Sequence, residues 1–232
     1  MSFGAMAASY VMAADTSPVP LLSFAFDEGD GNDFYATHGN TSGSGGATWW
    51  GLSMPGHGTA VIRTVEDQGS SWQTLTVGNI LFADDSDGWS TSSWTALSVM
   101  CWYMPMEMTY GAVRVPFAFY DPDGPDWLGV SQDSDGYLET WIGGENTNQT
   151  TSPIADNSWA HLAVVWDGSS LLFYVDGAVV ASRPTTELPK QLHYMNINGA
   201  HWSHAGGAID DFRLFNVALT PEQVTTFMMT PV

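Results

Sequence analysis

Asp-Gly dipeptides recur between short apolar segments of this chain, and this arrangement restricts its fold more than any other feature. They occupy residues 87–88, 123–124, 135–136, 167–168 and 176–177. Asp-Gly is favoured in two-residue hairpin turns, where the backbone adopts a positive φ that glycine and aspartate tolerate. The clearest case joins an apolar segment at 172–175 to another at 178–181. We therefore expect antiparallel β-hairpins to be the basic unit of the fold.

The segments between the turns have the composition of strands. They are rich in Val, Phe, Tyr and Trp, and clusters of Gly, Asp, Pro and Ser bound them. The predicted strands lie at residues 21–26, 97–103, 113–120, 128–131, 136–142, 159–166, 171–175 and 208–215. Residues 146–150 are polar and are predicted to form a loop. Many short strands with almost no helical periodicity indicate an all-β sandwich or barrel.

One short helix is predicted near the C-terminus. Residues 220–223 read Thr-Pro-Glu-Gln. This order places a hydroxyl at the N-cap, proline at the first helical position and glutamine at the third, which is the start signal of a capping box. An apolar stripe with helical spacing follows at Val224, Phe227 and Met228.

The charge of the chain is strongly acidic. Five Lys and Arg residues against 25 Asp and Glu residues give a formal net charge of −20. Such a surface repels phosphates, so we expect neither nucleic-acid binding nor attraction to anionic lipid. It attracts cations instead, which leaves three alternatives: a calcium-binding fold, a protein that works in brine or in a medium rich in divalent ions, or acidity that serves solubility alone.

The first 20 residues differ from the remainder of the chain. They are rich in Ala, Met and Ser and close at Pro18 and Pro20. We interpret residues 1–20 as an apolar arm, either disordered in isolation or buried against another subunit, and residues 21–232 as one domain. No Lys or Arg precedes the apolar run, which disfavours a cleaved signal peptide. No apolar stretch approaches the roughly 18 to 20 residues that span a bilayer, so no membrane insertion is expected.

Three segments together resemble a known family. Residues 157–168 with 172–177 are similar to the central strand pair of laminin-G-like domains, and residues 207–220 resemble the closing strand that precedes their short helix. Residues 24–31 resemble the first strand and turn of the same domains. The resemblance implies a two-sheet antiparallel jelly-roll sandwich of the concanavalin-A-like type with one short C-terminal helix.

A narrower resemblance concerns the arm. Residues 2–10, Ser-Phe-Gly-Ala-Met-Ala-Ala-Ser-Tyr, are similar to the start of minor tail proteins of tailed bacteriophages that infect actinobacteria. Laminin-G-like domains lie near the tail tip in that group. The resemblance implies a virion location, with an extracellular location as the alternative, and contacts of the arm with other virion subunits. We expect a homo-oligomer or a part of a larger assembly.

Calcium is the cofactor that the family resemblance implies, in a structural role. The candidate ligands are Asp27 in the first turn and Asp210 or Asp211 in the closing strand, two segments that lie adjacent in the family. A carboxylate pair in an apolar strand needs a partner, which is either the cation or Arg213, unless the pair is exposed to solvent. The Asp-rich segments 84–88 and 133–136 also resemble calcium loops, but we interpret both as hairpin turns.

Candidate ligand-binding residues are the tryptophans in or beside loop-like sequence, because flat apolar rings stack on sugars. They are Trp49, Trp50, Trp89, Trp127 and Trp202. Burial in the core explains any single one of them equally well. The histidines at 193, 201 and 204 lack the spacing of a zinc site and are interpreted as surface or turn residues.

The sequence offers no catalytic constellation. Glycoside hydrolases need two carboxylates flanking the sugar bond, and strand residues two apart share a face. Glu139 is the one acid between Tyr137 and Trp141 on a face of its strand. We therefore predict a non-enzymatic module of a phage tail tip that binds a cell-surface glycan. The alternative is a structural protein that decorates a virion and binds no sugar; a secreted glycan hydrolase using Glu139 is a remote third option.

Overall fold

The computed structural model describes most of the domain expected at residues 21–232. The described residues are 17–27, 33–35, 37, 42–44, 49–51, 60–63, 75–77, 89–90, 94–106, 113–120, 128–142, 145–150, 152–185, 191–192, 194–197 and 207–232. Residues 1–16, which form most of the predicted arm, lie outside them. The division into arm and domain therefore stays a prediction.

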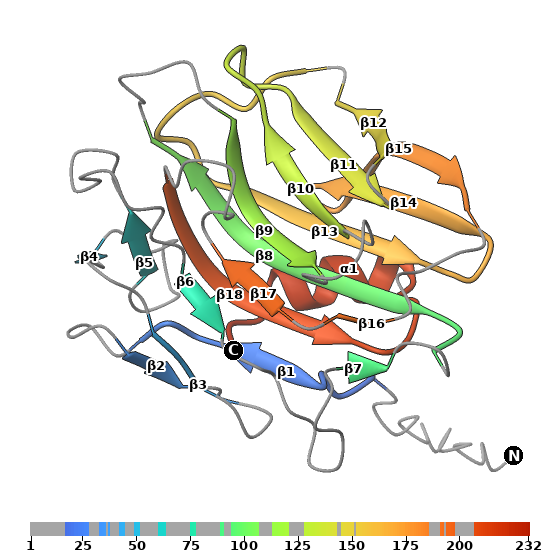
Figure 1. Ribbon diagram of the computed structural model, residues 1–232, viewed down its shortest axis with the longest axis horizontal. Coiled ribbons are helices and arrows are strands. Elements are labelled where there is room, and N and C mark those ends of the chain that lie inside the picture. Colours follow the sequence, from blue (N-terminus) through green and yellow to red (C-terminus); the bar gives the residue numbers. More distant parts are fainter. Residues whose placement is uncertain are drawn as a thin grey trace, which may run out of the picture.

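Two antiparallel sheets lie one over the other and confirm the predicted all-β sandwich (Figure 1). Sheet A runs in the order β15 (Ala178–Pro184), β14 (Ser170–Val175), β13 (Ala160–Trp166), β8 (Leu97–Pro105), β18 (Gly207–Phe215), β5 (Ala60–Arg63) and β4 (Trp49–Gly51), with β1 (Leu22–Phe24) also pairing to β18. Sheet B runs in the order β12 (Glu145–Gln149), β11 (Leu138–Ile142), β10 (Leu128–Gln132), β9 (Arg114–Tyr120), β17 (Tyr194–Ile197), β6 (Leu75–Val77), β3 (Ser42–Ser44) and β2 (Asp33–Tyr35). A separate ribbon pairs β7 (Trp89–Ser90) with β16 (Gln191–Leu192).

The predicted Asp-Gly turns form wherever the structure describes them. Asp176 and Gly177 have φ values of 50° and 77° and join β14 to β15, the conformation that a tight hairpin turn requires. At the turn between β10 and β11, the Asp133 carboxylate accepts the N–H groups of Asp135 and Tyr137, each at 2.9 Å. The interpretation of residues 133–136 as a turn is therefore confirmed. Residues 84–88 lie outside the described residues.

The three segments that resemble laminin-G-like domains come together in sheet A. The first of them, residues 24–31, begins at Phe24, the last residue of β1, which pairs with Phe212 of β18. Residues 28–31 lie outside the described residues. Strand β8 lies between β18 and β13, so the middle hairpin and the closing strand are separated by one strand. Segments from both ends of the domain thus meet in the same sheet.

Several strands were not predicted from the sequence. One prediction was wrong: residues 145–149, five polar residues that include most of the expected loop, form edge strand β12 and pair with β11. A backbone ladder at a sheet edge needs no apolar side chains, so the side-chain pattern gave no signal there. Trp49, Trp50 and Trp89 likewise lie in the short strands β4 and β7, where loop-like sequence was expected.

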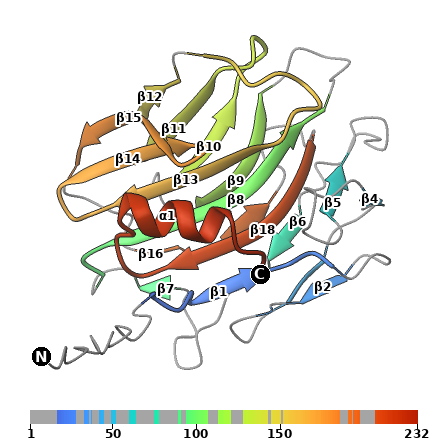
Figure 2. The ribbon, with the colours of Figure 1, turned by 180° about the vertical axis from the view of Figure 1, so that it is seen from behind.

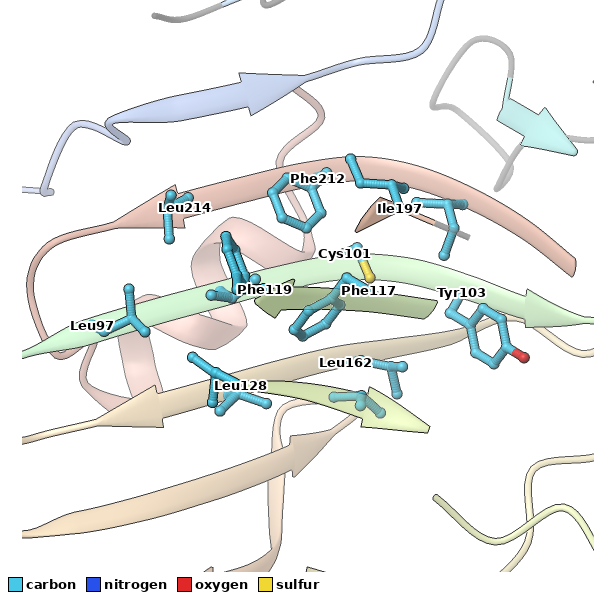
Figure 3. Close-up of a cluster of buried hydrophobic side chains, with 14 of the residues drawn as sticks. Leu97, Cys101, Tyr103, Phe117, Phe119, Leu128, Leu162, Ile197, Phe212 and Leu214 are labelled. Carbon is cyan, nitrogen blue, oxygen red and sulfur yellow. The ribbon is translucent and has the colours of Figure 1, made fainter. Parts of the chain in front are cut away.

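The core fills the space between the sheets. Phenylalanine and leucine side chains from both sheets interdigitate around Cys101, which is fully buried (Figure 3). Many of these side chains come from strand positions that alternate inward, among them Phe24, Leu97, Phe117, Phe119, Leu128, Val130, Leu162, Phe173, Phe212 and Leu214. Burial raises the pKa of the Cys101 thiol above its ordinary range, and nearby Asp210 acts in the same direction.

The predicted helix α1 spans Pro221–Met228 and packs on the outer surface of sheet A, away from sheet B (Figure 2). Its capping box is present: Thr220 accepts from the Gln223 backbone N–H, and the Gln223 side chain accepts from the Thr220 N–H. Val224 is fully buried, in contact with a second apolar cluster that includes Met100, Tyr174 and Phe215. Within the described residues no helix is long and apolar enough to cross a membrane.

Candidate binding face

Strand alternation assigns the two faces of sheet B. Leu138 and Ile142 belong to the core, so Glu139 and Trp141 lie on the outward face of β11. In β10, Leu128 and Val130 point inward, which places Gly129 and Ser131 outward. The register sets Trp141 opposite Gly129 and Glu139 opposite Ser131. We call these four residues together with Tyr137, which precedes β11, the β10–β11 face.

An aromatic ring rests on the sheet at this face. A Cβ atom at Gly129 would lie 2.5 Å from Cζ2 of Trp141, which shows that the indole lies against the bare backbone of β10. Val115 and Ala118 of β9 complete this small apolar cluster, in which Trp141 is only 3% exposed. The indole is therefore the floor of the face, and the partly exposed Tyr137 and Glu139 beside it are the groups that a ligand would reach.

The chemistry of the face combines three kinds of group. Tyr137 offers a ring and a hydroxyl, Glu139 a carboxylate acceptor, and the buried Ser131 a hydroxyl on the neighbouring strand. Strands β9, β10 and β11 contain one acid between them, Glu139. A ligand at this face could form hydrogen bonds and contact an aromatic ring. These three strands do not contain the pair of carboxylates that glycoside hydrolysis uses.

The five tryptophans predicted to bind ligand are not gathered at this face by the described backbone. Trp127 and Trp202 lie outside the described residues. Trp49 and Trp50 belong to β4 at the edge of sheet A, and Trp89 belongs to β7 in the two-stranded ribbon. Strands β4 and β7 lie on opposite sides of the molecule in both views (Figures 1 and 2). A ligand-binding role for each of the five tryptophans therefore stays a prediction.

The predicted calcium ligands occupy different environments. Asp27 is exposed, whereas Asp210 and Asp211 are almost completely buried in β18. The described residues contain no group of three His, Cys, Asp or Glu side chains that could hold a metal ion. Calcium binding stays a prediction that would need other oxygen ligands.

The buried aspartates of β18 have protein partners instead. A bulge between Asp210 and Arg213 gives Asp211 a φ of 47°. Asp210 Oδ1 accepts the Asp211 N–H at 2.8 Å, and Asp211 Oδ1 accepts the Val232 N–H at 3.2 Å. Burial lowers the pKa of Arg213, and the negative charges of Asp211 and Asp210 oppose that shift. Whether a cation or Arg213 is the partner of this carboxylate pair stays a prediction.

Arg213 also holds the end of the helix. Its guanidinium donates to the Phe227 carbonyl at 2.8 Å and to the Thr230 carbonyl, and it lies 5.6 Å from the centre of the Phe227 ring. Carbonyls at a helix C-terminus lack helical partners and attract cations. Asp211 and Arg213 together therefore fasten the last residues of the chain to sheet A, and we call them the C-terminal clamp.

Comparison with known proteins agrees with this architecture. A laminin-G-type sequence profile described as "Concanavalin A-like lectin/glucanases superfamily" matches residues 67–225. The chain belongs to this laminin-G-type family. No curated protein sequence matches the chain. The resemblance expected from the three sequence segments is thereby confirmed at the level of the family, and the fold is lectin-like.

Three solved structures are similar to this chain over most of its length. Domain 4 of AbnA, a GH43 extracellular arabinanase from Geobacillus stearothermophilus, superposes with a TM-score of 0.67 at 21% identity, over 90% of this chain and 97% of that domain. A Trypanosoma rangeli sialidase gives 0.63 at 14% identity over 92% of this chain. The receptor binding domain of a botulinum neurotoxin C/D mosaic serotype gives 0.65 at 12% identity over 90% of this chain. The present chain spans 33% of the sialidase and 51% of the toxin domain.

Proposed function

We propose that this laminin-G-type domain is a non-catalytic module that binds a cell-surface glycan through the β10–β11 face. The observation that carries the proposal is the outward row of Tyr137, Glu139 and Trp141, with Ser131 and the small Gly129 on the adjacent strand. An aromatic ring beside hydrogen-bonding groups on a rigid sheet is the usual arrangement of a site for a polar ligand with apolar faces.

One structural neighbour supports a glycan as the ligand class, and a second supports a binding role. Domain 4 of the arabinanase AbnA was solved in complex with arabinotriose, and it matches this chain over nearly its whole length. The toxin neighbour is a receptor binding domain. Both are binding portions of larger proteins, which supports a binding role for the same fold here.

The non-catalytic part of the proposal comes from the sequence, in which no second acid lies two residues from Glu139 on its strand. Glycoside hydrolysis with two carboxylates requires them about 5 to 10 Å apart across the sugar bond. Glu139 has no acidic neighbour in these three strands. In this proposal Glu139 accepts hydrogen bonds from sugar hydroxyls and transfers no proton to a leaving group.

The virion location is part of the same proposal. The resemblance of residues 2–10 to phage minor tail proteins supports a tail-tip protein whose arm contacts other virion subunits, with the sandwich facing the host. The alternative, a structural decoration protein, predicts that the β10–β11 face is covered by another subunit in the assembled particle and that the isolated chain binds no glycan.

Glycan binding by the purified chain tests the proposal. We would screen a glycan array and then titrate arabinotriose and the best array ligand by calorimetry against the wild type, Tyr137→Ala and Glu139→Gln. Binding should weaken about tenfold or more in each variant, since the variants remove a ring contact and a charged acceptor. Glu222→Gln removes one acid from helix α1 on the other side of sheet A, so it should bind as the wild type does. Tyr137→Phe keeps the ring and removes the hydroxyl, so its affinity should lie between those of the wild type and Tyr137→Ala.

The result that overturns the proposal is equally direct. Wild-type protein that retains its fold and binds no glycan on the array, while it binds purified virion subunits, would establish the structural alternative. Hydrolysis of a bound oligosaccharide that Glu139→Gln abolishes would instead establish a hydrolase.

A further inference from the structure

Gln132 makes four hydrogen bonds in the interior of the sandwich. It is the last residue of β10 and is fully buried. Its Oε1 accepts from the Tyr103 hydroxyl at 3.0 Å and from Arg114 Nη1 at 2.9 Å. Its Nε2 donates to the carbonyls of Gly136 at 3.0 Å and Ile154 at 3.1 Å. Both donors and both acceptor positions of the amide are therefore used.

The carbonyl half of the amide joins the two sheets. Tyr103 comes from β8 of sheet A, whereas Arg114 comes from β9 of sheet B. Tyr103 lies at the edge of the labelled core cluster with its hydroxyl directed away from the other rings (Figure 3). Burial raises the pKa of Tyr103 far above its ordinary range, so the hydroxyl remains a donor. Arg114 continues the network to Asp156 at 3.0 Å.

The amino group of Gln132 binds two surface segments. Gly136 belongs to the turn between β10 and β11, and Ile154 belongs to the segment at residues 152–159. The Ile154 N–H also donates to the Gly136 carbonyl at 2.9 Å, so the two segments contact each other as well. Gly136 has a φ of 89°, and a Cβ atom there would lie 3.1 Å from both Pro153 and the Ile154 carbonyl.

The turn at residues 133–136 leads directly into the β10–β11 face. The Asp133 N–H donates to the Tyr137 carbonyl at 2.9 Å, and the Tyr137 N–H donates to the Asp133 carboxylate. Thr150 contributes from the other side: its N–H donates to the Leu138 carbonyl, and its hydroxyl accepts the Leu138 N–H. The backbone of Tyr137 therefore lies between the closed turn at residues 133–136 and the hydrogen-bonded pair of Leu138 and Thr150.

We propose that Gln132 is the positioning residue of the binding face: its amino group fixes the 133–136 turn and the 152–159 segment, and thereby the height of Tyr137 above the sheet. The inference rests on the proposed function of that face. Buried amides with every donor and acceptor satisfied specify one arrangement, because any displacement leaves polar groups unpaired. A site ordered before the ligand arrives avoids the entropy cost of ordering it on binding.

Two nearly isosteric variants separate the two halves of the amide. Gln132→Glu keeps the acceptors for Tyr103 and Arg114 but places an oxygen against the carbonyls of Gly136 and Ile154. Tyr103→Phe removes the cross-sheet hydrogen bond and leaves both carbonyl contacts intact. Each variant alters buried hydrogen bonds, so both should lower the unfolding midpoint. Hydrogen exchange of the amides at residues 133–138 and 152–156, and glycan affinity, are then measured on both.

Only the variant that loses the Gln132 amino group should make the turn at residues 133–136 more mobile. In Gln132→Glu, we expect faster exchange in the two surface segments with unchanged exchange in β8 and β13, and about five- to tenfold weaker glycan binding. In Tyr103→Phe, we expect wild-type exchange in these segments and affinity within about twofold of wild type. A merely structural role predicts that affinity follows the unfolding midpoint equally in both variants.

The outcomes keep the two proposals apart. Unchanged exchange at residues 133–138 in Gln132→Glu, or equal affinity losses in the two variants, would overturn the positioning role of Gln132. If the wild type binds no glycan, the proposed function fails, while the exchange comparison still decides whether Gln132 fixes the turn.

Discussion

The Trp141 indole lies on Gly129 so closely that β10 has no space for a side chain at that position. A Cβ atom there would stand 2.5 Å from Cζ2 of the ring and 2.8 Å from the Phe117 carbonyl oxygen on the other neighbouring strand. The ring could move, but the carbonyl belongs to the backbone of a central strand. The floor of the proposed binding face therefore depends on glycine at this point.

Gly129→Ala should destabilise the domain by about 1–3 kcal/mol, because the added methyl group forces the indole or the strand to shift. Urea unfolding monitored by tryptophan fluorescence measures the change. Val179→Ala is the control: this side chain lies in edge strand β15 and is 50% exposed, so its change should stay within about 0.5 kcal/mol. A wild-type midpoint in Gly129→Ala would contradict the packing described here.

Arg213→Lys should weaken the C-terminal clamp. Lysine keeps the charge but lacks the planar fork that reaches the Phe227 and Thr230 carbonyls together. We expect a loss of about 1–3 kcal/mol, with faster hydrogen exchange in helix α1 than in β8. Arg183→Lys is the control, because it makes the same substitution in edge strand β15. It should leave the hydrogen exchange of helix α1 unchanged. Equal protection of α1 in both variants would show that Arg213 does not hold the helix.

Calcium should leave the role of the buried aspartates unchanged. Since the Asp210 and Asp211 carboxylates accept backbone N–H groups and lie near Arg213, we expect Asp211→Asn to lower the unfolding midpoint equally in millimolar calcium and in EDTA. Differential scanning calorimetry measures both conditions. A calcium-dependent rise of the wild-type midpoint that Asp211→Asn or Asp27→Asn abolishes would instead establish the metal site predicted from the sequence.

Asp167 should titrate below the ordinary range of an aspartate. The Ser169 hydroxyl and the backbone N–H groups of Ser169 and Ser170 donate to its carboxylate and lower its pKa. A lowered folded-state pKa gives a stabilisation that is present above the unfolded value and is lost as the pH falls through the folded one. Ser169→Ala should raise the pKa of Asp167, measured by NMR titration of the carboxyl carbon. Ser134→Ala, in another turn, should not change it.

Local patterns were sufficient for the turns and the helix. Asp176 and Gly177 adopt positive φ because these residue types tolerate it, and Thr220 and Gln223 cap each other within one turn. The interactions that decide such features lie within a few residues of each other. The segments that match the laminin-G-type family were recognisable by their residue patterns alone, which is why the fold class was predictable.

The candidate site was only partly predictable. The alternation around Glu139 was visible in the sequence, but whether Tyr137 and Trp141 face the core or the exterior depends on which face of β11 meets sheet A. The tryptophans chosen from loop-like sequence remain untested, whereas Trp141, in a predicted strand, forms the floor of the face. Whether a tryptophan lies in a strand or in loop-like sequence therefore does not tell whether its indole lies at a binding face.

The sequence by itself determined the strands with strong alternation, the Asp-Gly turns, the capped helix and the acidic charge, because each depends on residue types and short-range geometry. Only the tertiary structure decided which groups meet across the sandwich. Tyr103, Arg114, Gln132 and Ile154 come from separate segments and converge on one amide. Hydrogen bonds and close packing act over a few ångströms in space, whatever the separation along the chain.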